Sequence, residues 1–209
     1  MASIASIFKK NFLTALFFSL GICVTSNAMQ IRPLAQFDFP ADVTTNKRVE
    51  SVKEEKEWNS GPVFIGGAEM LFTAEFAPIR YGLGIGFKSP QKNGNSTITP
   101  AFLPIWGNFS FGFYNKDWKA IPYAVVRAGT MGALTGAGSW WERPYNFFVV
   151  AGIGTLLPYN IGFEVNFDYS SVYKSFEHRD TKFRISSGRI GLQLSIGFEL
   201  AHERIYTSD

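Results

Sequence analysis

Apolar and polar residues alternate along most of the chain after residue 29, and one segment shows this most clearly. Between Asn160 and Tyr173, one face collects Ile161, Phe163, Val165, Phe167, Tyr169 and Tyr173. The other face collects Gly162, Glu164, Asn166, Asp168 and Ser170. A helix would scatter both sets around its axis, whereas a pleated strand separates them. The segment is therefore predicted to be a strand with one bulky apolar face.

The same alternation predicts seven further strands, which makes the chain all-β. The eight expected strands are Gln30–Phe39, Val63–Thr73, Tyr81–Lys88, Leu103–Phe113, Ile121–Thr130, Asn146–Leu157, Asn160–Tyr173 and Arg189–Leu200. The first is the weakest because it contains Pro33 and is followed by Pro40, and proline is best tolerated at a strand end or a bulge.

The connections between these strands alternate between long and short. The long ones are residues 41–61, 89–98, 132–144 and 174–183. This rhythm is typical of outer-membrane barrels, which have short periplasmic turns and longer external loops. We therefore expect a closed, antiparallel, up-and-down, eight-stranded transmembrane β-barrel. Within the first long loop, the charged stretch Lys47–Trp58 is compatible with a short helix or with a solvated loop that contacts lipopolysaccharide.

Residue size predicts which face of each strand points inward. Bulky apolar residues would overfill the interior of a small barrel, whereas lipid places no limit on their size. The other face is rich in glycine and in charges of both signs, which we expect to form an ion-paired, plugged lumen. The charged members of this luminal set are Arg32, Asp38, Glu69, Arg80, Lys88, Arg127, Glu164, Asp168, Arg189 and Glu199.

Aromatic residues cluster near the expected strand ends, which suits interfacial girdles. The candidates are Trp106, Trp118, Tyr123, Trp140, Trp141, Tyr145, Tyr159, Tyr169 and Tyr173. Ordinary aromatics of a soluble β-core are the alternative interpretation.

The N-terminus has the pattern of an export signal. Lys9 and Lys10 precede the apolar segment Phe12–Val24, and Ser26-Asn27-Ala28 places small residues where a signal peptidase cleaves. We expect a signal peptide over residues 1–28 with cleavage after Ala28, a barrel over residues 29–200 and a tail over residues 201–209. The expected location is the outer membrane.

Composition excludes several classes of protein. The 209 residues carry a net charge of only +3 and no lysine- or arginine-rich block, which argues against nucleic-acid binding. The single cysteine, Cys23, excludes an intrachain disulfide framework and a cysteine-rich metal site.

The pattern resembles the small OmpA/OmpX-like eight-stranded outer-membrane barrels of Gram-negative bacteria, over about residues 29–200. The best local match is the final hairpin, from Asn160-Ile161-Gly162-Phe163 to the alternating segment Arg189–Phe198. Members of that group often end in an aromatic residue used in assembly, whereas here Phe198 is followed by residues 199–209 and the last residue is Asp209. The resemblance implies contact with outer-membrane lipid, lipopolysaccharide and the assembly machinery.

No motif in the sequence indicates catalysis, a cofactor or a metal. His178 and His202, the two histidines, lie in a predicted loop and in the tail. Gly82, Gly84 and Gly86 alternate within a strand and are followed by no helix, unlike a phosphate-binding loop. The expected role is therefore structural or surface-interactive, with a surface ligand bound through the four long loops.

Three other functions stay open at this point. The first is a narrow channel, and the second is a soluble lipocalin-like barrel that binds a small lipophile on an inward apolar face. The third is a lipid-modifying enzyme.

Overall fold

The computed structural model describes residues 28–49, 52–74, 78–113, 119–134, 146–176 and 181–202. The expected signal peptide therefore lies outside the described residues, apart from Ala28, as do His178 and residues 203–209. Among the described residues, no helix is long and apolar enough to cross a membrane.

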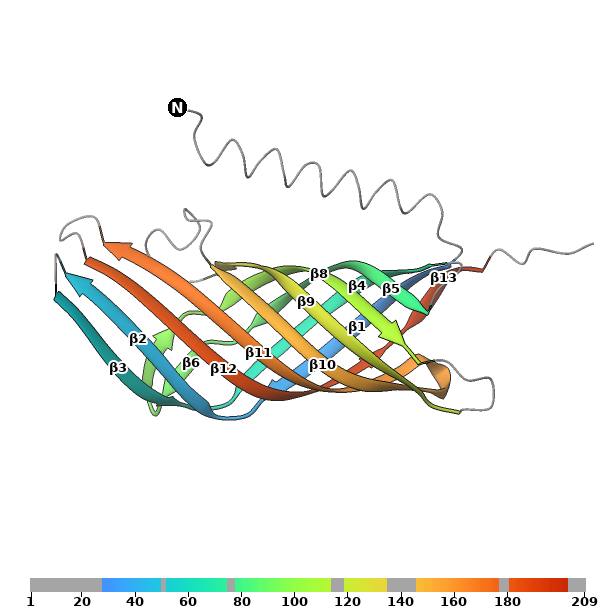
Figure 1. Cartoon of the computed structure of the whole chain (residues 1–209), viewed down its shortest axis with the longest axis horizontal. Helices are drawn as coiled ribbons and strands as arrows, with labels where there is room; N and C mark the ends of the chain where they lie inside the picture. The colour runs from blue at the N-terminus through green and yellow to red at the C-terminus, as the bar shows by residue number, and fades with distance from the viewer. Residues whose placement is uncertain are drawn as a thin grey trace, which may run out of the picture.

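Eight antiparallel strands close into an elongated barrel (Figure 1). They are β1 (Ala28–Asp38), β4 (Val63–Thr73), β5 (Ile79–Lys88), β8 (Phe102–Gly112), β9 (Ile121–Ala133), β10 (Phe147–Leu157), β11 (Ile161–Phe176) and β12 (Thr181–Ile196). Each pairs with the next in this order, and β1 closes the barrel against β12. The predicted fold is confirmed, including the weak first strand, in which Pro33 lies exposed on the outer face.

A short strand, β13 (Phe198–His202), continues β12 after Gly197 and pairs with the beginning of β1. A Cβ at Gly197 would collide with the amide end of the Gln30 side chain, so a larger residue at this break in the ladder would require Gln30 to move. Ala28 pairs with His202, which places the first and last described residues side by side. The strand therefore runs two residues into the expected tail.

The first long connection was expected to be a loop, with or without a short helix, but it forms a β-hairpin. β2 (Ala41–Val49) pairs with β12, and β3 (Val52–Ser60) pairs with β2. Extended backbone over the described residues of this stretch, 47–49 and 52–58, satisfies its hydrogen bonds against a neighbouring strand, which an isolated short helix cannot do. We call the sheet formed by β3, β2, the Thr181–Ser187 part of β12 and the paired part of β11 the sheet extension. It projects beyond the rest of the barrel wall at the left of Figure 1.

Of the other long connections, only that of residues 174–183 is shortened by its flanking strands. Between β5 and β8, β6 (Gln91–Asn93) and β7 (Ser96–Thr99) form a small hairpin, with Gly94 in a left-handed turn conformation. β11 and β12 together extend into both ends of residues 174–183, and β9 runs to Ala133. At the opposite end of the barrel, the short 3-10 turn η1 (Pro158–Asn160) joins β10 to β11.

Candidate functional site

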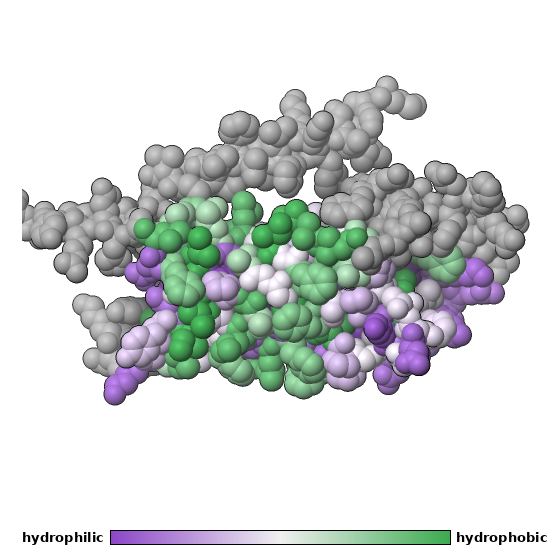
Figure 2. Space-filling model, turned by 180° about the vertical axis from the view of Figure 1, so that it is seen from behind, coloured by the Kyte–Doolittle hydropathy of each residue, from purple (hydrophilic) through white to green (hydrophobic). Residues whose placement is uncertain are grey.

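The outer and inner faces of the barrel have opposite chemistry. Large apolar side chains point outward along the wall, including Ile153, Phe167, Ile190 and Leu194, which are 51–70% exposed. Figure 2, which views the barrel from behind, shows apolar residues across the middle of that face as well and hydrophilic residues toward its two ends. The lipocalin-like alternative requires the reverse arrangement, with bulky apolar residues lining the interior, and is therefore wrong.

Inside the barrel, four charged side chains from four strands form one network, which we call the central cluster. It consists of Arg32, Glu69, Arg127 and Glu164, each at most 2% exposed. Arg32 on β1 faces Glu69 on β4 in register, and its Nη2 lies 2.6 Å from Glu69 Oε2. Two guanidinium groups and two carboxylates cancel in charge, which makes their burial tolerable.

Arg127 on β9 links both carboxylates of the central cluster. Its Nε donates to Glu69 Oε1 at 2.6 Å, and Nη1 and Nη2 donate to the two oxygens of Glu164 at 2.7 and 2.9 Å. A fork of donors matched to a carboxylate is the strongest kind of protein hydrogen bonding. This one side chain thus ties β9 to β4 and to β11 across the lumen.

Three neutral donors complete the central cluster, and none of them belongs to the predicted set of luminal charges. Trp106 Nε1 and Asn108 Nδ2 each donate to Glu69 Oε1 at 2.8 Å, and the Tyr123 hydroxyl donates to Glu164 Oε1 at 2.7 Å. Trp106 and Tyr123 were expected in the aromatic girdles, and that expectation is wrong. Their positions among the polar, inward-facing residues of their strands were the available signal.

Glycines make room for these large luminal side chains. Gly84 lies directly opposite Trp106 on the neighbouring strand, and a Cβ at Gly84 would overlap the indole ring. A Cβ at Gly154 would likewise contact Glu164 and the Tyr123 ring. The glycine-rich face is therefore the complement of bulky luminal residues, as a narrow eight-stranded interior requires.

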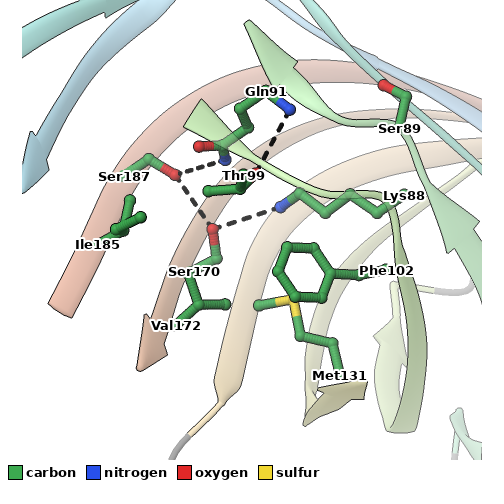
Figure 3. A pocket seen from close by; sticks show the side chains of 10 residues that line it. All are labelled: Lys88, Ser89, Gln91, Thr99, Phe102, Met131, Ser170, Val172, Ile185 and Ser187. Atoms are coloured by element: carbon green, nitrogen blue, oxygen red, sulfur yellow. Dashed lines mark hydrogen bonds between the residues drawn. The ribbon is translucent and has the colours of Figure 1, made fainter. Parts of the chain in front are cut away.

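A second polar group lies nearer the sheet extension, and we call it the upper cluster (Figure 3). Lys88 Nζ lies 3.1 Å from Asp168 Oδ2 and donates to Ser170 Oγ at 3.4 Å. Ser170 and Ser187 share a hydrogen bond of 3.1 Å, and Gln91 Nε2 donates to Ser187 at 3.2 Å. Gln91 comes from β6, so the small hairpin is fastened to β12 across the end of the lumen.

Arg189 and Asp38 lie beside the upper cluster but form no ion pair with each other. Arg189 Nη1 donates to the carbonyls of Phe39 and Gly61 at 3.1 and 2.9 Å, where β1 leaves the barrel and β4 enters it. Asp38 Oδ1 accepts from Gln36 Nε2 at 2.6 Å. Arg189 thus holds the junction between the barrel and the hairpin of β2 and β3.

An apolar layer separates the two clusters and leaves little space. It contains Leu34, Trp106, Phe148 and Val150, all buried. The cavity beside this layer has a volume of about 20 Å³, and the cavity beneath the β6–β7 hairpin has about 10 Å³. Such volumes are on the scale of a single water molecule. At these two places along the lumen, the described side chains leave room for about one water molecule each.

Eight of the ten predicted luminal charges lie buried inside the barrel: Arg32, Asp38, Glu69, Lys88, Arg127, Glu164, Asp168 and Arg189. Arg80 is only half-buried. Glu199 is exposed and accepts a 3.5 Å hydrogen bond from Asn160, so its assignment to the lumen is wrong. It follows the break at Gly197, which carries it to the rim of the barrel.

The remaining site predictions have mixed outcomes. Of the other expected girdle residues, Tyr159 is fully exposed at the η1 turn, and Tyr169 and Tyr173 are half-buried. Trp118, Trp140, Trp141 and Tyr145 lie outside the described residues. No group of three or more His, Cys, Asp and Glu in the described ranges could hold a metal ion.

The chain matches no protein-family model and no curated protein sequence. Its fold is similar to that of the outer membrane protein OprG from Pseudomonas aeruginosa, with a TM-score of 0.50 and 12% identity over 85% of this chain and 97% of that one. The outer membrane protein AlkL in lipid bilayers aligns with a TM-score of 0.42 and 14% identity over 81% of this chain and 91% of that one. The OprG similarity and the closed eight-strand topology show that this chain has the fold of a small outer-membrane β-barrel.

Proposed function

We propose that this protein is anchored in the bacterial outer membrane by its barrel and acts at the cell surface through its sheet extension. The role is structural or surface-interactive, and it involves no catalytic step. The observation that carries the proposal is the change in outward-facing residues along a single strand. On β12, Ile190 and Leu194 are apolar and exposed, whereas Arg184 and Ser186 on the extension are polar.

This change in chemistry supports a defined membrane boundary. Lipid solvates the apolar band, and every backbone group within the band is paired because the barrel is closed. Beyond the band, the outward residues of β2 and β3 are polar or charged, including Asn46, Glu55 and Glu57, all of them exposed. The apolar band is therefore assigned to outer-membrane lipid, and the extension to water and lipopolysaccharide.

The orientation follows from the expected export signal and from the positions of the short turns. Both described chain ends lie at the short-turn end, with Ala28 paired to His202. A barrel inserted from the periplasm by the assembly machinery keeps its short turns there. The sheet extension and the β6–β7 hairpin then face outward, where a surface ligand can reach them.

A filled lumen supports an anchor rather than a pore. The central cluster, the apolar layer and the upper cluster succeed one another along the barrel axis, and the cavities between them hold about one water each. The channel alternative requires a continuous water path. In planar bilayers, Arg127→Ala is expected to leave conductance at the baseline, and a large rise would favour latent transport.

The direct test is cell fractionation followed by electrophoresis of boiled and unboiled outer membranes. We expect the protein in the outer-membrane fraction, with a mobility that shifts on boiling, and extension residues accessible to an impermeant label on whole cells. A soluble periplasmic protein would contradict the proposal. Altered lipid A in a deletion strain would contradict the absence of catalysis.

A further inference from the structure

The sheet extension ends in an edge strand. In the order of the sheet, β3 is terminal, and among the described residues it pairs with β2 alone. Near its C-terminal end β3 contacts β6, and just past that end Gly61 N donates to the Lys92 carbonyl. An edge strand presents a row of unpaired N–H and C=O groups, which is a template for another strand.

The charges on β3 are arranged as a self-complementary series. Residues 53–57 read Lys-Glu-Glu-Lys-Glu, and all five side chains are exposed. When two copies run antiparallel and are centred on Glu55, Lys53 of each faces Glu57 of the other, and Glu54 faces Lys56. Four opposite-charge pairs form for one like-charge pair, Glu55 with Glu55, and directly opposed charges of unlike sign stabilise a sheet.

Other alignments of the two strands lose this match. A parallel, in-register pair places every charge opposite its own kind. Faces are preserved only by shifts of two residues. The shift that centres the pair on Glu54 keeps only two opposite-charge pairs, Lys53 with Glu55, for one like-charge pair. The shift that centres it on Lys56 opposes Lys56 to itself and Glu55 to Glu57 twice. Charges on an edge ordinarily prevent pairing, but here their order favours one register of self-pairing over its neighbours.

From this arrangement we propose that β3 binds β3 of a second copy of this chain, displayed on an opposing membrane. The twofold axis of an antiparallel pair of identical strands is perpendicular to the sheet. The sheet extension stands along the long axis of the barrel (Figure 1). A half-turn about an axis perpendicular to this sheet therefore points the second barrel in the opposite direction to the first. Two barrels in one membrane point the same way and cannot adopt this pairing.

The inference rests on the proposed function, because it requires the sheet extension to face outward from an outer membrane. A single pair of short strands is a weak contact. Many copies on two facing membranes act together, and the joint binding then greatly exceeds that of one pair. The expected activity is homotypic adhesion between cells.

Cysteine cross-linking tests the register. Cys23 is the only cysteine of the sequence, so the Cys23→Ser variant of the full chain provides a thiol-free background. Each lipid nanodisc holds one barrel of this variant. Under mild oxidation, Glu55→Cys is expected to cross-link with itself, whereas Glu57→Cys cross-links with Lys53→Cys and not with itself. Asn46→Cys on β2, one strand in from the edge, is the control and should stay monomeric.

Charge reversal tests the recognition. The unchanged protein is expected to join two nanodiscs into one particle of twice the mass, and to make cells that express it cluster with one another. Lys53→Glu should abolish both effects, and the double variant Lys53→Glu/Glu57→Lys should restore both. Lys119→Glu makes the same charge change at an exposed site on the opposite end of the barrel and should have no effect. Barrels that shift on boiling but neither cross-link at residue 55 nor respond to Lys53→Glu overturn this inference alone. A cross-link at residue 55 that forms only when two barrels share one disc also overturns it. Loss of the shift itself contradicts the proposed function instead.

Discussion

The barrel body and the sheet extension are parts of one hydrogen-bonded sheet, yet they are built for different surroundings. In the body, outward residues such as Phe167 are apolar and inward residues such as Glu164 are charged and fully buried. In the extension, outward residues such as Asn46 and Glu55 are polar, and the inner face carries Val43 and Ile185. The comparison shows that strand pairing determines the shape of both parts, whereas the distribution of apolar and polar side chains between the two faces determines the environment that each part suits.

The two parts also use charge differently. Arg127 and Glu164 bond within a closed lumen, where removing one partner leaves the other buried and uncompensated. Lys47 and Glu54 lie 3.4 Å apart on the extension, where Lys47 is partly exposed and Glu54 largely exposed. Ion pairs in the body should therefore matter for stability, and those on the extension should matter little.

The largest expected effect is the loss of Arg127 from the body. Arg127→Met leaves both Glu69 and Glu164 without their main partner, and breaking a buried pair in this way costs about 3–5 kcal/mol. Urea unfolding of the barrel in lipid vesicles measures the loss. A change below about 1 kcal/mol, the range of exposed pairs, would remove the distinction between the two parts.

The next effect concerns the outer surface of each part. Leu194→Arg places a charge in the apolar band and should destabilise by about 2–4 kcal/mol. Asn46→Arg puts the same residue on the outward face of the extension and should stay within about 0.5 kcal/mol. Vesicle unfolding of both variants provides the comparison, and equal costs would show that the band does not contact lipid.

A smaller effect is expected from filling the luminal space. Gly84→Ala places a methyl group where the Trp106 ring lies, and overpacking of this kind costs about 1–3 kcal/mol. Gly107→Ala is the matched control because no atom lies closer than 4.0 Å to the added Cβ. The midpoint of the heat-induced mobility shift should fall for the first variant only.

The smallest effect is expected for the ion pair of the extension. Lys47→Met should lower the unfolding free energy by no more than about 1 kcal/mol, as for other exposed pairs. Raising the salt concentration should remove even this difference, because screening acts on exposed charges. A loss as large as that of Arg127→Met would indicate that the extension carries the stability of the fold.

Period-2 alternation was sufficient to predict the barrel, because a single apolar face specifies both strand and register. It also indicated most luminal charges, since Glu164 and Asp168 share a face with glycines. It failed for residues 47–58, where polar residues occupy both faces and only pairing with β12, distant in sequence, makes β2 a strand. The aromatic partners of Glu69 and Glu164 were missed as well, because Trp106 and Tyr123 were judged by residue type rather than by the face they occupy.

Depth measurements with spin labels test the central claim most directly. Labels are placed on the apolar band at Phe163→Cys and Leu194→Cys, and on the extension at Asn46→Cys and Lys53→Cys, in a Cys23→Ser background in lipid vesicles. The account predicts that oxygen, which concentrates in lipid, broadens the spectra of the two labels on the apolar band. A water-soluble nickel complex should broaden the spectra of the two labels on the extension. Nickel access at all four positions would contradict a barrel whose apolar face lies in the membrane.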